Sequence, residues 1–276
     1  MGPGASSVGR TGHHTLDTGV PQAFREFCAT VCRPMDAPLL NRVALVTGSA
    51  KRLGRAIALR LAREGADVVI HYHSSQVEAR QAASEVKQLG RRSIALAADL
   101  TRVSEIQRLF QQAFDHFGRL DILVNSAANF LYTEFGSTSE KLWDEALTTN
   151  LKAPFFCSQA AAPLLKLSRG VIINFADIGG LLAWPGYIPH CVSKAGLLML
   201  TKCLAKALAP DVRVNAIAPG TITMSGDPSE WESEFVRCAP LHRSGTTDDV
   251  ADAVSFLIHS NFVTGQVLVL DGGRTL

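Results

Sequence analysis

Four side chains that could move a proton lie close together in the sequence: Asp177, Tyr187, His190 and Lys194. His190 and Lys194 are four residues apart, so on a helix they would lie on one face. Pro189 suits the first turn of such a helix, which leaves Tyr187 just outside it. Of the two candidate acids, the sequence therefore favours His190, and Tyr187 becomes a candidate for the wall of the substrate pocket.

The charges beside His190 decide whether it could donate a proton. An ammonium group at Lys194 disfavours a protonated imidazole next to it, whereas a carboxylate at Asp177 favours one. If Asp177 reaches His190, the pair could hold one transferable proton, with Asp177 orienting the ring. Two alternatives remain open: His190 as a helix-start residue in a protein that has lost chemistry, and Asp177 as a turn or cap.

A glycine-containing loop, VTGSAKRLG from Val46 to Gly54, connects the first predicted strand to the first predicted helix. Gly48 would permit the tight turn, and Gly54 would let the helix pack close to the strand. The free N–H groups at the helix start would then face a pyrophosphate. This placement predicts a dinucleotide site, with an ordinary strand-to-helix turn as the alternative.

The end of the second predicted strand bears on the choice of cofactor. Residues 71–75 read HYHSS and contain no carboxylate. A site for NAD usually places a carboxylate there, whereas the 2′-phosphate of NADP needs positive charge and hydrogen-bond donors. With Lys51 and Arg52 nearby, the sequence predicts NADP(H), and a solvated strand end is the alternative.

These candidates must be positioned by alternating strands and helices. Short, continuous apolar runs alternate with longer amphipathic stretches, as a parallel sheet covered on both faces requires. The pattern predicts an α/β fold, a single doubly wound Rossmann domain over residues 39–276 with a seven-stranded parallel sheet. The predicted strands are 42–48, 67–73, 93–100, 120–128, 169–177, 211–220 and 265–273, and the predicted helices are 52–64, 77–89, 103–117, 141–165, 190–208 and 248–259.

Residues 1–38 differ in composition from the rest of the chain. The first part is rich in Gly, Ser and Thr with little apolar periodicity, which favours a disordered leader. Residues 22–32 could form a short amphipathic helix. A second methionine, Met35, stands just before the first predicted strand, so the leader could be an appendage or a misassigned start.

Composition excludes several classes of function. The formal net charge is +2, and Lys and Arg are scattered, which argues against a nucleic-acid or membrane-surface protein. No apolar run is long enough to span a bilayer. The six cysteines form no CxxC pair, so we predict reduced thiols, a cytoplasmic protein and no metal site. The expected partner is a small molecule.

With these residues in view, the chain resembles the short-chain dehydrogenase/reductase family from about Asn41 to Gly273. The resemblance rests on TGSAKRLG, on NSAA at 125–128, on TTNLKAP and on APGTI. It also rests on Asp99 after the third predicted strand and on Lys194 in the predicted active-site helix. It implies a Rossmann fold, hydride transfer to or from a nicotinamide, and a homotetramer or homodimer. It also implies that Asn150 anchors a water that relays protons to Lys194; a helix-kink residue is the alternative for Asn150.

Within the family, the chain looks most like the pteridine reductases. The shared features are the TGxxxRxG loop, the HYH strand end, Phe130 after NSAAN, and Asp177 thirteen positions before His190. By this resemblance Arg52 would contact pyrophosphate and substrate, and Phe130 would stack on a flat ring over the nicotinamide; simple packing is the alternative for Phe130. The chain departs from the subgroup at Ser74, where an arginine is usual, and at His190, where the family has tyrosine.

The sequence thus predicts an NADPH-dependent oxidoreductase that transfers a hydride to a C=O or C=N bond of a small planar substrate, such as a pterin, a ketone or an imine. A catalytically silent NADP-binding sensor or partner subunit is the competing hypothesis. The segment from Met224 to Cys238 would suit a mobile flap over the substrate. The predicted catalytic residues are His190, Lys194, Asp177 and Asn150, and the predicted substrate residues are Phe130, Tyr187 and Trp184. The predicted cofactor residues are Gly48, Lys51, Arg52, Leu53, Gly54, His73, Ser74, Ser75, Asp99, Leu100, Asn125, Ser126, Ala127, Lys194, Pro219, Gly220 and Thr221.

Overall fold

The structure is a computed structural model that describes residues 1–2, 37–223 and 230–276. The chain divides into two units, Met1–Asp36 and Ala37–Leu276. Almost all of the predicted leader, including the helix predicted at 22–32, lies outside the described residues, and so does the first part of the predicted flap. The second unit carries the fold.

Seven parallel strands form one sheet in the order β3-β2-β1-β4-β5-β6-β7. This confirms the predicted seven-stranded parallel sheet. Every residue of β1, β4 and β5 is buried, because helices cover both faces of the sheet. The strands are β1 (Val43–Val46), β2 (Asp67–Tyr72), β3 (Ser93–Ala97), β4 (Ile122–Asn125), β5 (Val171–Phe175), β6 (Arg213–Pro219) and β7 (Val267–Leu270).

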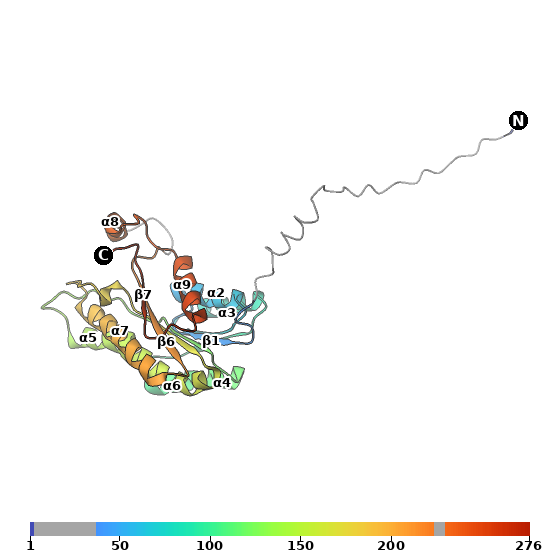
Figure 1. The fold of residues 1–276 in the computed structure, drawn as a ribbon, viewed down its shortest axis with the longest axis horizontal. Helices are drawn as coiled ribbons and strands as arrows, with labels where there is room; N and C mark the ends of the chain where they lie inside the picture. Colours follow the sequence, from blue (N-terminus) through green and yellow to red (C-terminus); the bar gives the residue numbers. More distant parts are fainter. Residues whose placement is uncertain (3–36, 224–229) are drawn as a thin grey trace. The chain divides into compact units, whose positions relative to one another are not determined.

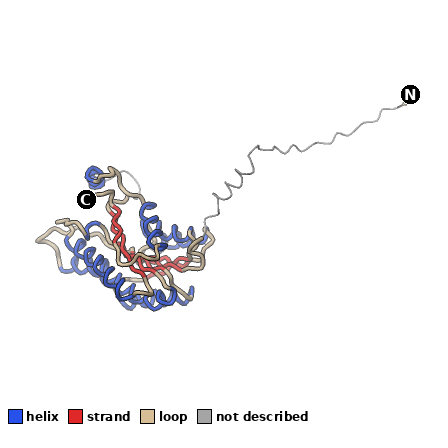
Figure 2. Tube along the Cα trace, viewed as in Figure 1, coloured by secondary structure: helices blue, strands red, loops and turns tan. Residues whose placement is uncertain are grey.

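The helices form one layer on each face of the sheet (Figures 1 and 2). On one face, α2, α3 and α9 pack over an apolar core, and on the other α4 and α6 pack over a second core, with α7 alongside α6. The helices are α2 (Arg52–Arg63), α3 (Gln76–Gln88), α4 (Val103–Phe117), α5 (Glu140–Leu147), α6 (Ala153–Ser168), α7 (Ile188–Leu208), α8 (Glu230–Cys238) and α9 (Thr247–His259).

The helical segment predicted over residues 141–165 is present, but it is not a regular α-helix throughout. The structure has α5, then a π-helical turn at Thr148–Lys152, then α6. Pro154 lies in the first turn of α6 and has no N–H to donate to the carbonyl four residues earlier, which disfavours regular α-helical hydrogen bonding at this point. The turn places Asn150, which is 1% exposed, toward the interior.

Helix α7 begins at Ile188, with Pro189 in its first turn and Tyr187 as its N-cap residue. The helix start predicted from Pro189 is therefore confirmed. A short 3₁₀ helix, η2 (Ile178–Gly180), follows β5 and makes close contact with α7. The carboxyl ends of the parallel strands meet at one edge of the sheet, which is where ligands bind in open α/β sheets.

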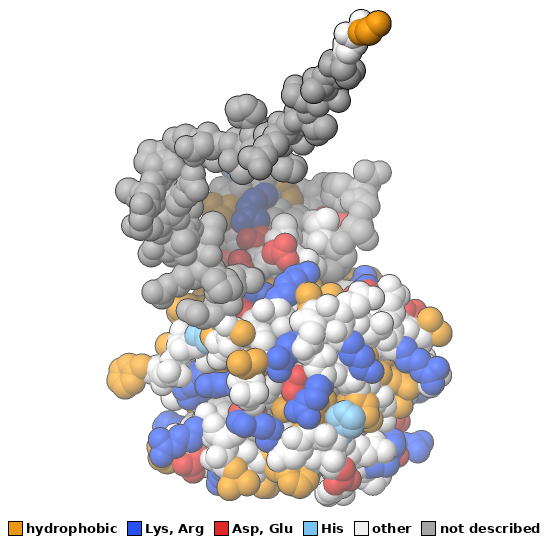
Figure 3. Space-filling view, turned by 90° about the vertical axis from the view of Figure 1, so that its right-hand side faces the viewer, with side chains coloured by type: hydrophobic (Ala, Val, Ile, Leu, Met, Phe, Trp, Pro, Cys, Tyr) orange, Lys and Arg blue, Asp and Glu red, His pale blue; other side chains and the backbone are white. Residues whose placement is uncertain are grey.

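The surface agrees with the scattered charge of the sequence. On the face shown in Figure 3, Lys and Arg side chains are interspersed with acidic and apolar ones. Among the helices that the structure describes, none combines the length and the apolar character needed to cross a membrane. Cys157, Cys191, Cys203 and Cys238, the cysteines in the described part of the chain, are free thiols.

Candidate active site

The loop after β1 is held tightly against the loop after β4. The hydroxyl of Thr47 accepts hydrogen bonds from the backbone N–H groups of Ser126 and Ala127, at 2.9 and 3.0 Å. Gly48 has a φ of +65°, and a Cβ atom there would lie 2.9 Å from the Cα of Ala127. Only glycine combines this backbone conformation with so close an approach.

The start of α2 is equally close to this loop. A Cβ atom on Gly54 would lie 2.5 Å from the carbonyl oxygen of Gly48, so the side chain of any other residue would displace the turn. Arg52 has a φ of +51°, a left-handed conformation that costs an L-residue roughly 1–2 kcal/mol. The chain therefore places an arginine where the backbone geometry favours glycine. Leu53 follows within the first turn of α2.

An acidic side chain from α3 lies near the end of β2, where residues 71–75 contain none. Lys51 forms an ion pair with Glu78 of α3 at 2.6 Å, and this contact lowers the pKa of Glu78. Both side chains are about half exposed. His73 and Ser74, which follow β2, are exposed, and Ser75 is the N-cap residue of α3. A carboxylate thus lies near the predicted 2′-phosphate site, although it is absent from residues 71–75.

The side chain of Asn125 does not lie at the cofactor edge. It is 2% exposed and donates hydrogen bonds to Asn174 and Ser158 in the core, at 2.9 and 3.2 Å. Asn174 in turn donates to Thr201 at 2.9 Å. This buried polar ladder ties β4 and β5 to α6 and α7. If Asn125 contributes to the cofactor site, it does so through its backbone.

Asp177 and His190 form a side-chain pair, which we call the dyad. Oδ2 of Asp177 lies 2.7 Å from Nε2 of His190, and Oδ1 accepts a hydrogen bond from the N–H of Gly179 at 2.8 Å. Asp177 is therefore a cap for η2 and a partner of His190 at once. The Asp177 side chain is 22% exposed and that of His190 only 3%, so Asp177 is the member that a substrate can reach.

The charges around the dyad favour an ionised Asp177. Burial raises the pKa of Asp177, but the hydrogen bond from His190 and the charge of Lys194 outweigh burial and hold this pKa below its ordinary value. Burial also lowers the pKa of Lys194, which Asp177 partly offsets. Nζ of Lys194 donates to the carbonyl oxygen of Phe175 at 2.8 Å.

The hydrogen-bond partners of the two ring nitrogens of His190 indicate where the protons of the dyad lie. Nδ1 lies 3.3 Å from the backbone oxygen of Asn129, an atom that can only accept, so a proton on Nδ1 completes this contact. The 2.7 Å contact between Nε2 and Oδ2 then needs a proton of its own, whichever atom carries it. With that assignment, the dyad holds one proton that can be transferred.

Asn150 reaches this arrangement through the backbone of Asn129. Its Oδ1 accepts from the N–H of Asn129 at 2.9 Å, and its Nδ2 donates to the carbonyl oxygen of Asn129 at 3.1 Å and to Ser193 at 3.2 Å. Asn150 thus holds the same carbonyl that Nδ1 of His190 faces. Asn150 also lies in the π-helical turn, so the same residue belongs to the irregular part of the helix and to the site.

Aromatic rings surround the dyad. Phe130 stacks on Tyr187 at a centroid distance of 4.3 Å, and its ring is perpendicular to that of His190 at a centroid distance of 4.7 Å. Trp184 lies parallel to His190 at 6.3 Å. Phe130 is 51% exposed, so a ring with a large free surface lies beside the acid groups. The three predicted substrate residues are therefore together, from a loop after β4 and the start of α7.

The carboxyl end of β6 offers a polar group for a nicotinamide cofactor. Thr221 follows Pro219 and Gly220 and is 5% exposed, and its hydroxyl has no hydrogen-bond partner among the described residues. This free hydroxyl and the glycine turn at Gly48 fit a nicotinamide dinucleotide. After β3, the carboxylate of Asp99 stabilises a turn, because its Oδ1 accepts hydrogen bonds from the N–H and the hydroxyl of Thr101. Leu100 lies within this turn.

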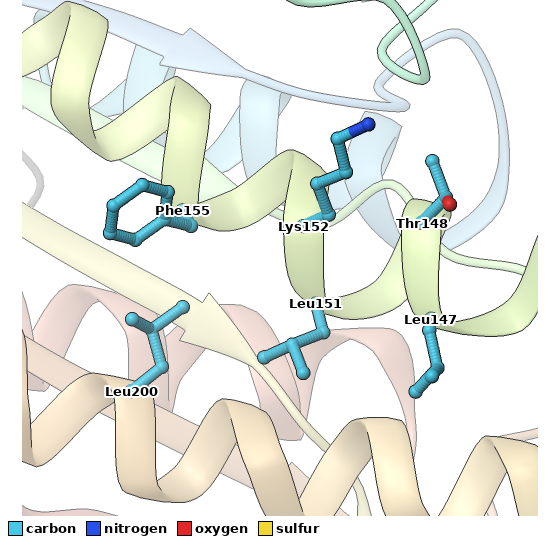
Figure 4. Close-up of a pocket in the computed structure, with 6 residues that line it drawn as sticks. All are labelled: Leu147, Thr148, Leu151, Lys152, Phe155 and Leu200. Carbon is cyan, nitrogen blue, oxygen red and sulfur yellow. The ribbon is translucent and has the colours of Figure 1, made fainter. Parts of the chain in front are cut away.

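A pocket of about 360 Å³ lies elsewhere, between α5, the π-helical turn, α6 and α7. In Figure 4, Leu147 and Leu151 point toward α7, Leu200 points back toward them, and the amine of Lys152 points away. Thr148 and Phe155 complete its lining. The lining contains no member of the dyad and no pair of acid or base groups, so the pocket is not a candidate for the chemistry.

Three residues of the site were missed from sequence. Thr47 holds the loop after β4, Asn129 supplies the carbonyl that faces His190, and Ser193 bonds both Asn150 and the carbonyl of His190. Thr47 could have been identified from the sequence, because it places a hydroxyl at the carboxyl end of an apolar strand. Asn129 acts through its backbone, for which a side-chain motif carries no signal.

Comparison with known proteins agrees with this fold. The family model described as enoyl-(acyl carrier protein) reductase matches residues 48–275. The 3-oxoacyl-(acyl-carrier-protein) reductase FabG of Staphylococcus epidermidis is 34% identical over 241 residues, spanning 85% of this chain and 99% of the relative. A short-chain dehydrogenase/reductase from Serratia marcescens superposes with a TM-score of 0.83 at 32% identity, covering 87% of this chain and 100% of that one. A blue fluorescent protein from a metagenomic library, solved in complex with NADPH, gives the same four values.

The fold and the site define a nicotinamide-dependent oxidoreductase with a doubly wound α/β domain. The chain belongs to the short-chain dehydrogenase/reductase family. Members of this family use a nicotinamide cofactor and act on small molecules, and both statements apply to this chain at that level.

Proposed function

We propose that this enzyme is an NADPH-dependent reductase that transfers a hydride to a C=O or C=N bond of a small planar substrate, with the Asp177–His190 dyad as the proton source. The observation that carries the proposal is the 2.7 Å contact between Oδ2 and Nε2, in which the carboxylate is partly exposed and the imidazole is buried. Pterin-like substrates, ketones and imines are the candidates.

The dyad would complete the reduction as follows. A bound nicotinamide supplies the hydride. When the substrate carbon accepts it, the electron pair of the double bond moves to the oxygen or nitrogen, which then needs a proton. Asp177 delivers this proton, and His190 passes its Nε2 proton to the carboxylate. The ring is left neutral with its proton on Nδ1, facing the carbonyl of Asn129. Solvent restores the proton through the partly exposed carboxylate.

Lys194 would assist by charge. Its ammonium group is buried one helical turn after His190 and stabilises the ionised Asp177 that remains after proton transfer. The aromatic rings support a planar substrate, because the exposed ring of Phe130 offers a face on which such a molecule can stack. If a bound planar substrate displaced Phe130 from Tyr187, the ring of His190 would also be uncovered.

NADP(H) rather than NAD(H) is supported by residues 71–75, which contain no carboxylate, and by the positive charges of Lys51 and Arg52 nearby. Glu78 opposes this preference as long as it holds Lys51. We expect the 2′-phosphate to compete with Glu78 for the ammonium group of Lys51. A homotetramer or homodimer is expected from the family resemblance, and light scattering on the purified protein measures it.

The test is NADPH oxidation by the purified protein with a panel of dihydropterins, quinones, ketones and imines. His190→Tyr should retain or raise turnover, because it restores the usual acid of the family. His190→Phe should abolish turnover while NADPH still binds, because it keeps an aromatic ring and removes both nitrogens. An active His190→Phe variant would refute the assignment of the dyad.

A catalytically silent NADP-binding protein is the second candidate. The burial of His190 in place of a tyrosine favours it, since a 3% exposed side chain has little access to a substrate. Tight NADPH binding with no oxidation across the whole panel, by the wild type and by His190→Tyr alike, would select this function over the first.

A further inference from the structure

A buried histidine, His71, connects two segments of the cofactor edge. It lies near the end of β2 and is 2% exposed. Its Nδ1 accepts a hydrogen bond from the backbone N–H of Gly48 at 3.0 Å, and its Nε2 lies 3.1 Å from the carbonyl oxygen of Ala98. Gly48 forms the turn after β1, and Ala98 precedes Asp99 after β3. The imidazole of His71 therefore connects the loop that follows β1 to the loop that follows β3.

The two contacts define the state of the ring. The N–H of Gly48 can only donate and the carbonyl of Ala98 can only accept, so the ring is neutral with its hydrogen on Nε2. Burial lowers the pKa of His71 to about 4, with the neighbouring His73 acting in the same direction, whereas the bond to Ala98 opposes the shift. The neutral form therefore persists throughout the physiological range.

The surroundings leave the glycine turn little freedom on its other side. Ser49 exchanges two hydrogen bonds with the backbone of His71, through its N–H at 3.0 Å and its hydroxyl oxygen at 3.1 Å. A Cβ atom on Gly48 would already overlap Ala127. These contacts fix the turn to β2 and β4, and β2 is joined to the segment after β3 by the hydrogen bond from the N–H of Ala98 to the carbonyl of Tyr72 at 3.0 Å. The imidazole adds a direct connection from the turn to Ala98.

We propose that His71 is a positioning residue of the dinucleotide site, which aims the turn at Gly48 through Nδ1 and joins it to the segment before Asp99 through Nε2. The N–H of Gly48 is occupied by this bond, so a pyrophosphate must be bound by other donors of the loop, which are held in place by the fixed turn. The inference rests on nicotinamide cofactor binding by the family and not on the proton source or on the substrate.

Two substitutions separate the two bonds. In His71→Asn, Oδ1 takes the place of Nδ1 and can still accept from Gly48, but the side chain is too short to reach Ala98. In His71→Gln, the longer amide can donate to Ala98 and leaves the N–H of Gly48 without its acceptor. His71→Leu removes both bonds. His116→Asn, on the exposed surface of α4, is the matched control.

The measurement is the dissociation constant of NADPH, and separately of NADH, by titration without turnover, so failure of the reductase assay does not affect it. We expect His71→Asn and His71→Gln, which each lose one bond, to bind about three- to fivefold more weakly than the wild type, since one hydrogen bond contributes about 1 kcal/mol, a factor of about five. His71→Leu, which loses both bonds, should bind at least about tenfold more weakly. Thermal unfolding of each variant shows whether affinity merely follows stability.

Equal affinity of all variants would overturn the proposal, and so would an Asn variant as weak as the Leu variant. Where a variant fails to fold, the wild type still decides the matter through ¹⁵N NMR of its histidines. The proposal requires a buried ring with its hydrogen on Nε2 that stays neutral at pH values well below the usual histidine range. A ring protonated on Nδ1, or one that titrates as an exposed histidine does, would contradict it.

Discussion

The cofactor edge and the dyad differ in what holds them. At the cofactor edge, the contacts are mostly between backbone groups, glycine positions and one buried imidazole, as at Gly48, Gly54 and His71. At the dyad, two side chains meet across thirteen residues of sequence. The cofactor edge can change little without loss of the fold, whereas the dyad can change its chemistry while the backbone stays the same.

The largest expected effect separates turnover from binding at the dyad. In Asp177→Asn, the amide can still cap η2 but can no longer deliver a proton, so we expect turnover to fall by about 100-fold or more. NADPH affinity should remain within about threefold of the wild type. Steady-state kinetics and a binding titration measure the two effects. Near-normal turnover would remove Asp177 from the mechanism.

The next prediction concerns close approach at the cofactor edge. Gly48→Ala and Gly90→Ala both place an L-residue at positive φ, +65° and +77°, and should each lose about 1 kcal/mol of unfolding free energy. Only Gly48 has a neighbour within 3 Å of the added Cβ atom, whereas Gly90 has none within 4 Å. We expect Gly48→Ala alone to lose a further 1–2 kcal/mol or so and to bind NADPH at least about tenfold more weakly.

Denaturant unfolding and NADPH titration of this pair measure the difference. If the two variants lose equal stability and both keep full affinity, the close packing at Gly48 has no role in binding.

A smaller effect is expected at Arg52, where backbone strain and cofactor binding can be separated. Arg52→Gly relieves a left-handed conformation but makes the unfolded chain more flexible, so we expect a net gain of about 0.5–1 kcal/mol in unfolding free energy. The lost charge should weaken NADPH binding at low salt, and the deficit should shrink as salt rises. A less stable variant, or one with unchanged affinity at low salt, would contradict the role assigned to Arg52.

The smallest effect is expected at Glu78. Glu78→Gln releases Lys51 from its ion pair and should raise NADPH affinity a few-fold at low ionic strength, with little change for NADH. The ratio of the two dissociation constants is the readout. An equal change for both cofactors would indicate that Lys51 does not meet the 2′-phosphate.

The sequence predicted the sheet because parallel strands buried on both faces appear as continuous apolar runs, as at Ile122–Asn125 and Val171–Phe175. It predicted the start of α7 because Pro189 restricts the backbone locally. It did not predict the π-helical turn at Thr148–Lys152, because the apolar pattern continues through it.

The site was less predictable where contacts join distant segments. The pairing of Asp177 with His190 could be proposed from helix geometry and spacing, but the difference in exposure between the two side chains depends on how the aromatic residues pack. The carbonyl of Asn129 and the ion pair between Lys51 and Glu78 depend on tertiary structure, and no local pattern reports them.

The claim that the dyad supplies the proton is tested most directly by an experimental structure with NADPH and a tight-binding substrate analogue. The account predicts the Asp177 carboxylate within hydrogen-bond reach, about 3.2 Å, of the analogue atom that receives the proton, with His190 behind it and Phe130 against the ring. A structure in which the hydroxyl of Tyr187 occupies that place, while Asp177 remains a cap without contact to the analogue, would contradict it.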